Sequence, residues 1–289
     1  MASYITLHKK HFNFKEFVKN ALKEDVGDGD HSALATIPVS KKGKCQLLVK
    51  ENGIIAGIEA AKEIFKIIDP KIKFVQLIHD GAEVKVGQVA FTVEGSSQKL
   101  LTSERLVLNV MQRMSGIATK TKHLQNLCKG TKTKVIDTRK TTPGFRFFEK
   151  WAVVIGGGAN HRFGLYDMIM IKDNHVDFAG GISQALDATH AYLKRTKRKL
   201  PIEVETRNLD DVKVLLNKGG FQRIMLDNYT IADTKKAVKL INGKFEVESS
   251  GGITEKNIAQ YAKCGVDFIS VGALTHHVKS MDLSLKAIK

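Results

Sequence analysis

The stretch DTRKTTPGFR, residues 137–146, crowds anion-binding groups into a short segment. Thr138, Arg139, Lys140 and Arg146 can each donate hydrogen bonds to an anion, and a Pro-Gly pair lies among them. Guanidinium groups bind carboxylates and phosphates through paired, planar hydrogen bonds, and ammonium groups add point charges. The stretch therefore predicts a binding site for a small molecule that carries several negative charges.

Further clusters of polar residues follow in the second half of the chain. They are GGGANHR (156–162), IKDNH (171–175), EVE (203–205), LDN (226–228) and the Gly-rich pair SSGG (249–252) and SVG (270–272). Alone, each cluster is a weak signal, because GGGANHR lacks the GK[ST] ending of a Walker phosphate loop and IKDNH has no zinc-ligand spacing. The Gly-rich pair is similar to the phosphate-binding loops that follow the last strands of α/β barrels.

Together these clusters predict one site with a cationic side and an acidic side. The cations would be Arg139, Lys140, His161, Arg162, Lys172 and His175. Glu205 and Asp227 would face them as hydrogen-bond acceptors, and the Gly-rich loops would lie beside them. Such a site suits a small polyanion that carries both phosphates and hydroxyls.

The clusters lie where short apolar runs end, and this placement predicts the fold. The runs are KVIDTRKT (134–141), DMIMIKDNH (167–175), PIEVETRN (201–208), RIMLDN (223–228), FEVESSGG (245–252) and DFISVGALTH (267–276). Each has the length and β-branched content of a buried parallel strand, and amphipathic stretches of helical length separate the later runs. Strands that alternate with helices indicate an α/β barrel, whose chemistry lies at the carboxyl ends of the strands. A doubly wound open sheet is the structural alternative, but it would expect a Gly-rich turn after its first strand.

The first hundred residues have a different pattern. A helix (NFKEFVKNALKED), a polar loop, strand-like QLLVKENGIIAGI, a second helix and a strand pair indicate a separate α/β domain. Residues 100–127 have the pattern of a long helix or helix pair that joins the two domains without a flexible linker. We place the boundary near residue 112, with an N-terminal domain over 1–112, a barrel over 113–275, and residues 276–289 able to pack back on the N-terminal domain.

The chain is strongly basic, with 46 Lys and Arg against 30 Asp and Glu and a formal net charge of +16. This charge fits either a nucleic-acid-binding protein or an enzyme with a cationic site for anionic metabolites. The densest basic cluster, KRTKRK (194–199), follows an apolar-periodic stretch and predicts an exposed helix end, where cations interact favourably with the helix dipole. Since no aromatic residues are interleaved with it for base stacking, we expect no nucleic-acid partner.

Neither a membrane span nor a secretory signal is predicted. No window approaches the roughly 18 consecutive apolar residues of a membrane helix, and the N-terminus lacks the apolar core of a signal peptide. Cys45, Cys128 and Cys264 are odd in number and far apart, which suits a reducing compartment rather than a disulfide framework. We expect a cytoplasmic protein with no membrane partner.

The sequence resembles the quinolinate phosphoribosyltransferases along nearly the whole chain. The motifs that carry the resemblance are EDVGDGD (24–30), SERLVLN (103–109), SGIAT (115–119), DTRKTTPG (137–144), GGGANHR, IKDNH, EVE, LDN, SSGGI (249–253) and SVGALTH (270–276). DTRKTTPG, GGGANHR and KDNH in this order and spacing are highly specific. The resemblance implies an N-terminal α/β sandwich domain and an incomplete α/β barrel of about seven strands. It also implies an active site shared between the subunits of a homodimer, with a hexamer as the larger alternative.

The resemblance further implies a reaction and a role for each site residue. Quinolinate and phosphoribosyl pyrophosphate, with Mg²⁺, would give nicotinate mononucleotide, pyrophosphate and CO₂ in the de novo synthesis of NAD. Arg139, Arg162, His161 and Lys172 would hold the carboxylates of quinolinate, and Arg105 would reach in from the neighbouring subunit. Lys140, Glu205 and Asp227 would form the catalytic set: Lys140 on the phosphoribosyl donor, and the two carboxylates on ribose hydroxyls or on Mg²⁺, directly or through water. The remaining substrate-binding residues, most of them around the 5′-phosphate, would be Thr138, Ser250, Gly251, Gly252, Ser270 and Gly272.

Two other functions stay open at this point. A related type II phosphoribosyltransferase that acts on another aromatic acid would keep the phosphate-binding half and change the Arg and His residues. A basic nucleic-acid-binding protein would account for the net charge, but it would leave the strand-end carboxylates without a purpose.

Overall fold

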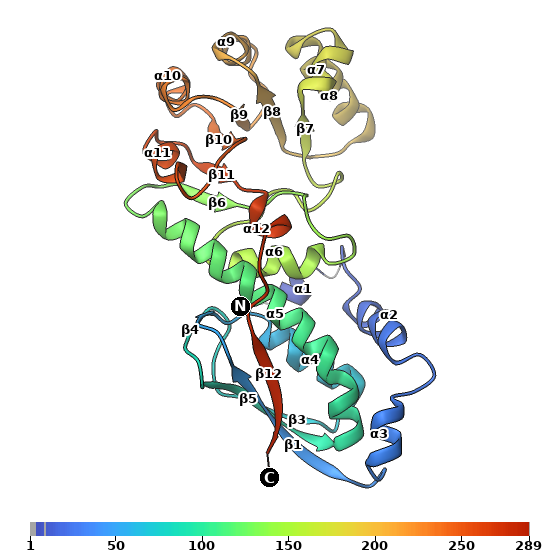
Figure 1. Ribbon diagram of the computed structural model, residues 1–289. Helices are drawn as coiled ribbons and strands as arrows, with labels where there is room; N and C mark the ends of the chain where they lie inside the picture. Colours follow the sequence, from blue (N-terminus) through green and yellow to red (C-terminus); the bar gives the residue numbers. More distant parts are fainter. Residues whose placement is uncertain (1–3, 9, 289) are drawn as a thin grey trace. The chain divides into compact units, whose positions relative to one another are not determined.

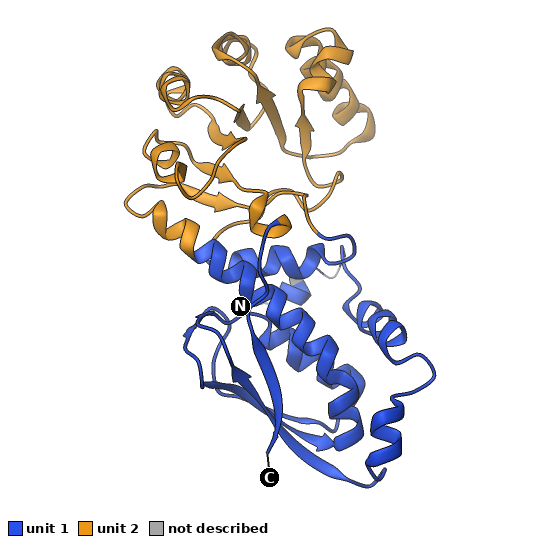
Figure 2. Cartoon of the chain, viewed as in Figure 1, with its two compact units in different colours: residues 1–122, 142–157, 277–289 blue, residues 123–141, 158–276 orange. Residues whose placement is uncertain are grey.

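The computed structural model describes residues 4–8 and 10–288. These residues form two compact units, which are coloured blue and orange in Figure 2. Unit 1 comprises the described residues up to 122 together with 142–157 and 277–288, and unit 2 comprises 123–141 and 158–276. Every predicted site residue except Arg105 belongs to unit 2.

Unit 1 is built on an antiparallel sheet with the strand order β12, β1, β5, β3 (Figure 1). Its strands are β1 (Lys42–Val49), β3 (Lys73–Gln76), β5 (Val89–Ser96) and β12 (Leu283–Ile288). Cys45, Leu47 and Val49 are buried and alternate with more exposed residues, as expected for a strand that packs one face on a core. The short strands β2 (Gly53–Ile54) and β4 (Glu83–Val84) pair with each other.

Helix α4 (Ile58–Ile68) supplies part of the helical layer of unit 1. The ring of Phe65 lies 6.2 Å from that of Phe91 in β5, and the ring of Phe74 lies 4.5 Å from Phe91. The other helices of this unit are α1 (Tyr4–His8), α2 (Phe14–Val26), α3 (His31–Thr36), α6 (Arg146–Ile155) and most of α5 (Ser97–Leu127). A helical layer on a sheet is the α/β sandwich that the resemblance implied.

The division of the chain differs from the predicted boundary near residue 112. That position lies inside α5, a continuous helix of 31 residues, because no proline interrupts the apolar positions there. Residues 142–157 belong to unit 1 rather than to the barrel, since Phe147 and Phe148 of α6 pack on Phe12 at 4.3 and 5.5 Å. At the other end of the chain, β12 pairs with β1 from Leu283 opposite Val49 onward.

Unit 2 is an incomplete barrel of parallel strands. The described sheet has six strands in the order β6, β11, β10, β9, β8, β7. They are β6 (Lys134–Ile136), β7 (Ile169–Ile171), β8 (Ile202–Thr206), β9 (Arg223–Asp227), β10 (Glu246–Ser250) and β11 (Phe268–Ser270). The first of these strands along the chain, β6, pairs with the last, β11, so that β6 and β7 form the two edges of the described sheet. An isolated parallel bridge between Ile136 and Ala159 places a seventh chain segment beside β6. All six predicted runs contain a strand, which confirms the α/β barrel prediction.

Helices follow these strands and set where each strand ends. They are α7 (Asp173–Ala179), α8 (Ile182–Thr196), α9 (Leu209–Lys218), α10 (Ile231–Ile241), α11 (Ile258–Ala262) and α12 (Ala273–His276). The side chain of Asn208 accepts from the N–H groups of Asp210 and Asp211 and so begins α9 directly after β8. The exposed cluster KRTKRK lies at the carboxyl end of α8, as predicted. None of the helices among the described residues is long and apolar enough to cross a membrane.

Candidate active site

The carboxyl ends of the barrel strands surround a cavity of about 880 Å³ in unit 2. The predicted site residues that line it are Thr138, Arg139, Lys140, His161, Arg162, Lys172, Glu205, Asp227, Ser250, Gly251, Gly252, Ser270 and Gly272. These residues come from all six strand ends and from the GGGANHR loop, so the barrel brings together what the sequence separates by more than a hundred residues. Arg105 lies at an exposed position of α5 in unit 1 and does not line this cavity.

A buried carboxylate holds the two cationic motifs beside each other. Asp137, at the end of β6, accepts hydrogen bonds from the backbone N–H of His161 at 2.9 Å and from the Nδ2 of Asn160 at 2.6 Å. The hydroxyl of Thr275 donates to the carbonyl of Lys140 at 2.8 Å and fixes the other end of the turn. The Asp of DTRK and the Asn-His of GGGANHR therefore form one rigid wall.

The wall that DTRK and GGGANHR form, which we call the cationic wall, contains two guanidinium groups, those of Arg139 and Arg162. Arg162 is only 9% exposed, and its Nη1 donates to the carbonyl of Met168 at 3.3 Å. Burial lowers the pKa of Arg162, and the nearby charge of Arg139 lowers it further. Because the two like charges repel each other, this wall is stabilised by an anion that contacts both.

The acidic side lies at the ends of β8 and β9. Glu205 is 9% exposed, and the Nζ of Lys172 lies 3.5 Å from its Oε2. Burial raises the pKa of Glu205; Lys172 opposes the rise, and the charges of Asp227 and Asp173 add to it. The site thus holds several carboxylates at one edge, a donor set that suits ribose hydroxyls or a hard cation.

His175 was predicted to join the cationic wall, and this prediction is wrong. Its Nδ1 accepts from the backbone N–H of Lys172 at 2.9 Å and closes the first turn of α7. His175 is exposed and is not among the residues that line the cavity. The sequence IKDNH does not indicate this role. The hydrogen bond to the N–H of Lys172 depends on the direction of the His175 ring, which residue type and spacing do not determine.

The loop after β10 has the backbone geometry of an anion-binding turn. Gly251 and Gly252 have φ angles of 85° and 60°, a left-handed conformation that glycine adopts without strain. A Cβ at Gly251 would also collide with the side chain of Asn228. In the loop after the neighbouring strand β11, a Cβ at Gly272 would come within 3.1 Å of the side chains of Lys140 and His276. Glycines therefore keep backbone N–H groups open to a phosphate.

Several residues that line the cavity were not among the predicted site residues. They are Met170, Asp173, Met225, Asn228, Glu248, Ile253, Thr254, Val271, Ala273 and His276. Asp173, Asn228 and His276 lie inside the motifs IKDNH, LDN and SVGALTH, but no role was assigned to them from the sequence. Glu248 was the strongest missed signal, because a carboxylate inside an apolar run is rare unless it is paired.

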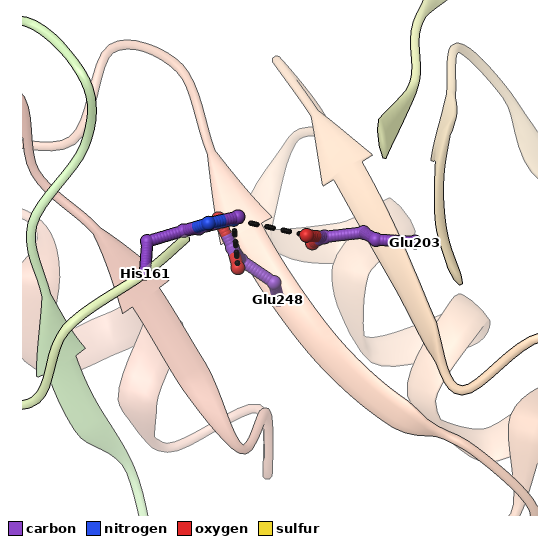
Figure 3. Close-up of side chains that lie close together, drawn as sticks. All are labelled: His161, Glu203 and Glu248. Atoms are coloured by element: carbon purple, nitrogen blue, oxygen red, sulfur yellow. Dashed lines mark ion pairs between the residues drawn. The ribbon is translucent and has the colours of Figure 1, made fainter. Parts of the chain in front are cut away.

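At the wall of the cavity, His161 lies beside two buried carboxylates from β8 and β10 (Figure 3). Its Nε2 lies 2.9 Å from Oε2 of Glu203 and 3.4 Å from Oε2 of Glu248, and both glutamates are fully buried. Its Nδ1 accepts from the backbone N–H of Arg162 at 2.6 Å. On the far side, Nη1 of Arg223 lies 3.2 Å from Oε2 of Glu248.

The charges of this cluster act on one another. Burial lowers the pKa of His161, whereas the contacts with Glu203 and Glu248 raise it. Burial raises the pKa of Glu203 to about 7, and the charge of Glu248 adds to that rise. The N–H of Arg162 opposes the charging of His161, because it points at Nδ1 and would repel a second ring proton. Because Nδ1 accepts this hydrogen bond, the geometry favours a ring proton on Nε2.

Comparisons with known proteins agree with these features. The sequence-family model of the quinolinate phosphoribosyl transferase N-terminal domain matches residues 30–115. The family model of the C-terminal domain matches residues 117–286. A mitochondrial quinolinate phosphoribosyltransferase (decarboxylating) 2b of Nicotiana tabacum is 44% identical over 95% of this chain and 82% of its own length. A probable nicotinate-nucleotide pyrophosphorylase (carboxylating) of Synechocystis is 39% identical over 93% of this chain and 90% of its own length.

Solved structures show the same relationship. NadC from Streptococcus pyogenes has a TM-score of 0.90 at 34% identity and covers 100% of both chains. The nicotinate-nucleotide pyrophosphorylase of Francisella tularensis has a TM-score of 0.88 at 38% identity and covers 95% of this chain and 96% of its own. The two matched domains include every residue of the cavity as well as Arg105. The chain belongs to the quinolinate phosphoribosyl transferase family.

Proposed function

We propose that this protein is a decarboxylating quinolinate phosphoribosyltransferase that works in NAD biosynthesis. The observation that carries the proposal is the pair of guanidinium groups in the cavity, where burial and the charge of Arg139 both lower the pKa of Arg162. Quinolinate carries two carboxylates on adjacent ring carbons, so one ligand can pair with both groups at once. Bidentate pairs of this kind also fix the orientation of the ring.

Other residues of the cavity suit the phosphoribosyl donor. Backbone N–H groups at Gly251, Gly252 and Gly272 would hold the 5′-phosphate. Lys140, whose side chain lies beside Gly272, would bind anionic oxygens of the donor. Glu205 and Asp227 would accept hydrogen bonds from the ribose hydroxyls and favour the positive charge that develops at the anomeric carbon.

The residues of the acidic side fit a magnesium ion. Glu205 and Asp227 both line the cavity and offer the oxygen ligands that Mg²⁺ prefers. Two carboxylates leave most of the coordination sphere to water and to phosphate oxygens, as is usual for Mg²⁺ at phosphate sites. When bound, the ion would neutralise the departing pyrophosphate.

The arrangement supports catalysis by positioning and electrostatics. The ring nitrogen of quinolinate forms a bond to the anomeric carbon while the bond to pyrophosphate breaks. The carboxylate beside the ring nitrogen then leaves as CO₂, its bonding electrons remain on the ring carbon, and that carbon takes up a proton. Arg139 and Arg162 hold the ring in place during both steps, and the protein forms no covalent bond to the substrate.

The proposal is tested by incubating the protein with quinolinate, phosphoribosyl pyrophosphate and Mg²⁺ and following nicotinate mononucleotide by mass spectrometry. Nicotinate is the matched control, because it lacks one carboxylate and would leave a buried cation unpaired. We expect kcat/KM for nicotinate to be lower by a factor on the order of 10⁴. Comparable turnover of the two acids would contradict the assignment and favour a related enzyme for another aromatic acid. Removing the divalent ions with EDTA should abolish turnover, and Mg²⁺ should restore it.

We also propose that the site is shared in a homodimer and that the protein is cytoplasmic. Arg105 supports the first proposal, because it is an exposed cation in the specific motif SERLVLN and yet does not line the cavity of its own unit 2. The three free, buried cysteines support a reducing compartment. Cell fractionation tests the second proposal, since some relatives are named as mitochondrial or chloroplastic proteins.

A further inference from the structure

The ring of His161 has both nitrogens directed at groups of the protein. Nδ1 faces the backbone N–H of Arg162 at 2.6 Å, and Nε2 faces the carboxylates of Glu203 and Glu248 at 2.9 and 3.4 Å. The side chain is only 5% exposed. In this arrangement the imidazole borders the cavity, but it has no nitrogen to offer to a carboxylate of quinolinate. Its contribution to the site must act through its neighbours.

Stability does not account for the two glutamates beneath the ring. The interior of an α/β barrel is usually filled with Val, Ile and Leu. Glu203 and Glu248 are both fully buried, and replacing buried ionic groups by apolar residues of similar volume is often neutral or stabilising. Glu248 is also held from the far side by Arg223 at 3.2 Å, and Arg223 in turn contacts Glu246 at 3.1 Å. His161 and Glu248 both border the cavity, whereas Glu203 contacts the cavity wall through the ring of His161.

A metal ion at this cluster is opposed by its own contacts. The ligand atoms of His161, Glu203 and Glu248 lie within 4.8 Å of one another, close enough to surround an ion. A metal on Nε2 would move the ring proton to Nδ1, where the N–H of Arg162 lies only 2.6 Å away. The guanidinium of Arg223 already occupies Oε2 of Glu248. The cluster therefore suits a ring proton and not a cation.

We propose that Glu203 and Glu248 are positioning residues that hold the His161 ring with its Nε2–H toward them and thereby fix the direction of Arg162 in the dicarboxylate site. The connection is short. The orientation of the ring sets the position of Nδ1, which accepts a hydrogen bond from the backbone N–H of Arg162. At the end of the Arg162 side chain, the guanidinium donates to the carbonyl of Met168 at 3.3 Å. This inference rests on the proposed function, because it assigns the fixed guanidinium to quinolinate.

The test compares Leu and Gln at the same position. Gln keeps an oxygen acceptor for Nε2–H, whereas Leu removes it with little change in volume. We expect Glu248→Leu and Glu203→Leu to raise KM for quinolinate about tenfold to a hundredfold, the effect of a misplacement of about 1 Å, and to leave KM for phosphoribosyl pyrophosphate within about threefold. Glu248→Gln and Glu203→Gln should restore most of the affinity for quinolinate.

The matched control is Glu255→Leu. Glu255 also pairs with a histidine, His123, at 2.9 Å, but its side chain is 65% exposed and does not line the cavity. This variant should leave both KM values unchanged. A wild-type KM for quinolinate in the Leu variants, or an equal rise in both KM values, overturns the inference.

A second measurement does not depend on activity. The ¹⁵N resonances of the His161 ring in the wild-type protein, assigned by their loss in His161→Asn, should show one protonated nitrogen, Nε2, and one bare nitrogen, Nδ1. A doubly protonated ring or the opposite tautomer overturns the inference. A wild-type protein without activity on quinolinate would instead refute the proposed function, and the ring measurement would still decide the arrangement of the cluster.

Discussion

At the scale of single residues, the main feature of the cavity is a pair of like charges, Arg139 and Arg162, that lie close enough to repel each other. Arg139 is exposed, whereas Arg162 is nearly buried and has its pKa lowered first by burial and then by Arg139. Neither side chain belongs to the apolar core of the barrel. Since the two like charges repel each other, we interpret their arrangement as suited to an anionic ligand rather than to the stability of the fold.

Truncation of either arginine should affect ligand binding far more than folding. Arg139→Ala and Arg162→Ala should each weaken quinolinate binding by about 1.5–3 kcal/mol per lost charged hydrogen bond, roughly tenfold to a hundredfold. The thermal unfolding midpoint should fall by no more than a few degrees, since no buried apolar contact is lost. Calorimetric titration with quinolinate and a thermal scan of each variant provide the check. Loss of the thermal transition would make these residues structural.

The sequence could predict those site residues whose place in the cavity depends only on their position at the end of a strand. Arg139, Lys172, Glu205 and Asp227 follow buried runs, and parallel strands bring their carboxyl ends to one edge, so their grouping followed from the sequence. The cap at His175 and the contacts of His161 depend on ring direction, which the pattern of residue types does not contain. The same limit explains why EVE was interpreted through Glu205 alone.

At the scale of elements, a buried ion pair joins two helices and a loop within unit 1. Glu149 of α6 is fully buried and accepts from Nε and Nη2 of Arg113 in α5 at 3.0 and 2.8 Å. It also accepts from the hydroxyl and the N–H of Thr142 at 2.8 and 3.1 Å. The TTPG turn is thus anchored by a residue seven positions further on, at the start of a helix that the predicted boundary assigned to the other domain.

Removing this carboxylate should destabilise unit 1 strongly. We expect Glu149→Ala to lower the free energy of unfolding by about 3–5 kcal/mol, because the partly buried guanidinium of Arg113 loses its partner. Urea denaturation followed by the fluorescence of Trp151 gives the measurement, since the chain has one tryptophan and it lies in α6. Glu63→Ala, which breaks an exposed pair with Lys66, should change the value by no more than about 1 kcal/mol. Equal effects of the two variants would contradict the role of Glu149.

The elements themselves were more predictable than their grouping. Each barrel strand is an apolar run that ends in polar residues, so the order of strands and helices in unit 2 could be derived locally. The assignment of α6 to unit 1 could not, because it depends on contacts of Phe147 and Phe148 with phenylalanines more than a hundred residues away.

At the scale of the whole molecule, the two residues that test a shared site lie in different units. Arg105 belongs to unit 1 and Lys140 to unit 2. In a two-fold dimer every contact occurs twice, so the Arg105 of one subunit can complete the site of its partner. Both single variants, Arg105→Ala and Lys140→Ala, should then be nearly inactive as homodimers.

Mixing the two variants should restore activity. In a mixed dimer one site retains both residues and the other lacks both. With random exchange about half of the dimers are mixed, so roughly a quarter of the wild-type activity should return. Native mass spectrometry establishes that exchange has occurred. A mixture that exchanges but stays as inactive as its parents would place Arg105 in the site of its own subunit.

The pairing of β12 with β1 has a consequence for how the protein is made. β1 is translated early, and its partner follows only after the whole of unit 2. At ordinary rates of synthesis the two strands leave the ribosome roughly 10 to 50 seconds apart. Throughout that interval the edge of β1 that β12 later covers is unpaired and can pair with a neighbouring nascent chain. The barrel can fold during translation, whereas the sheet of unit 1 is completed last, so a stall or a truncation before Leu283 leaves a finished barrel attached to an aggregation-prone edge.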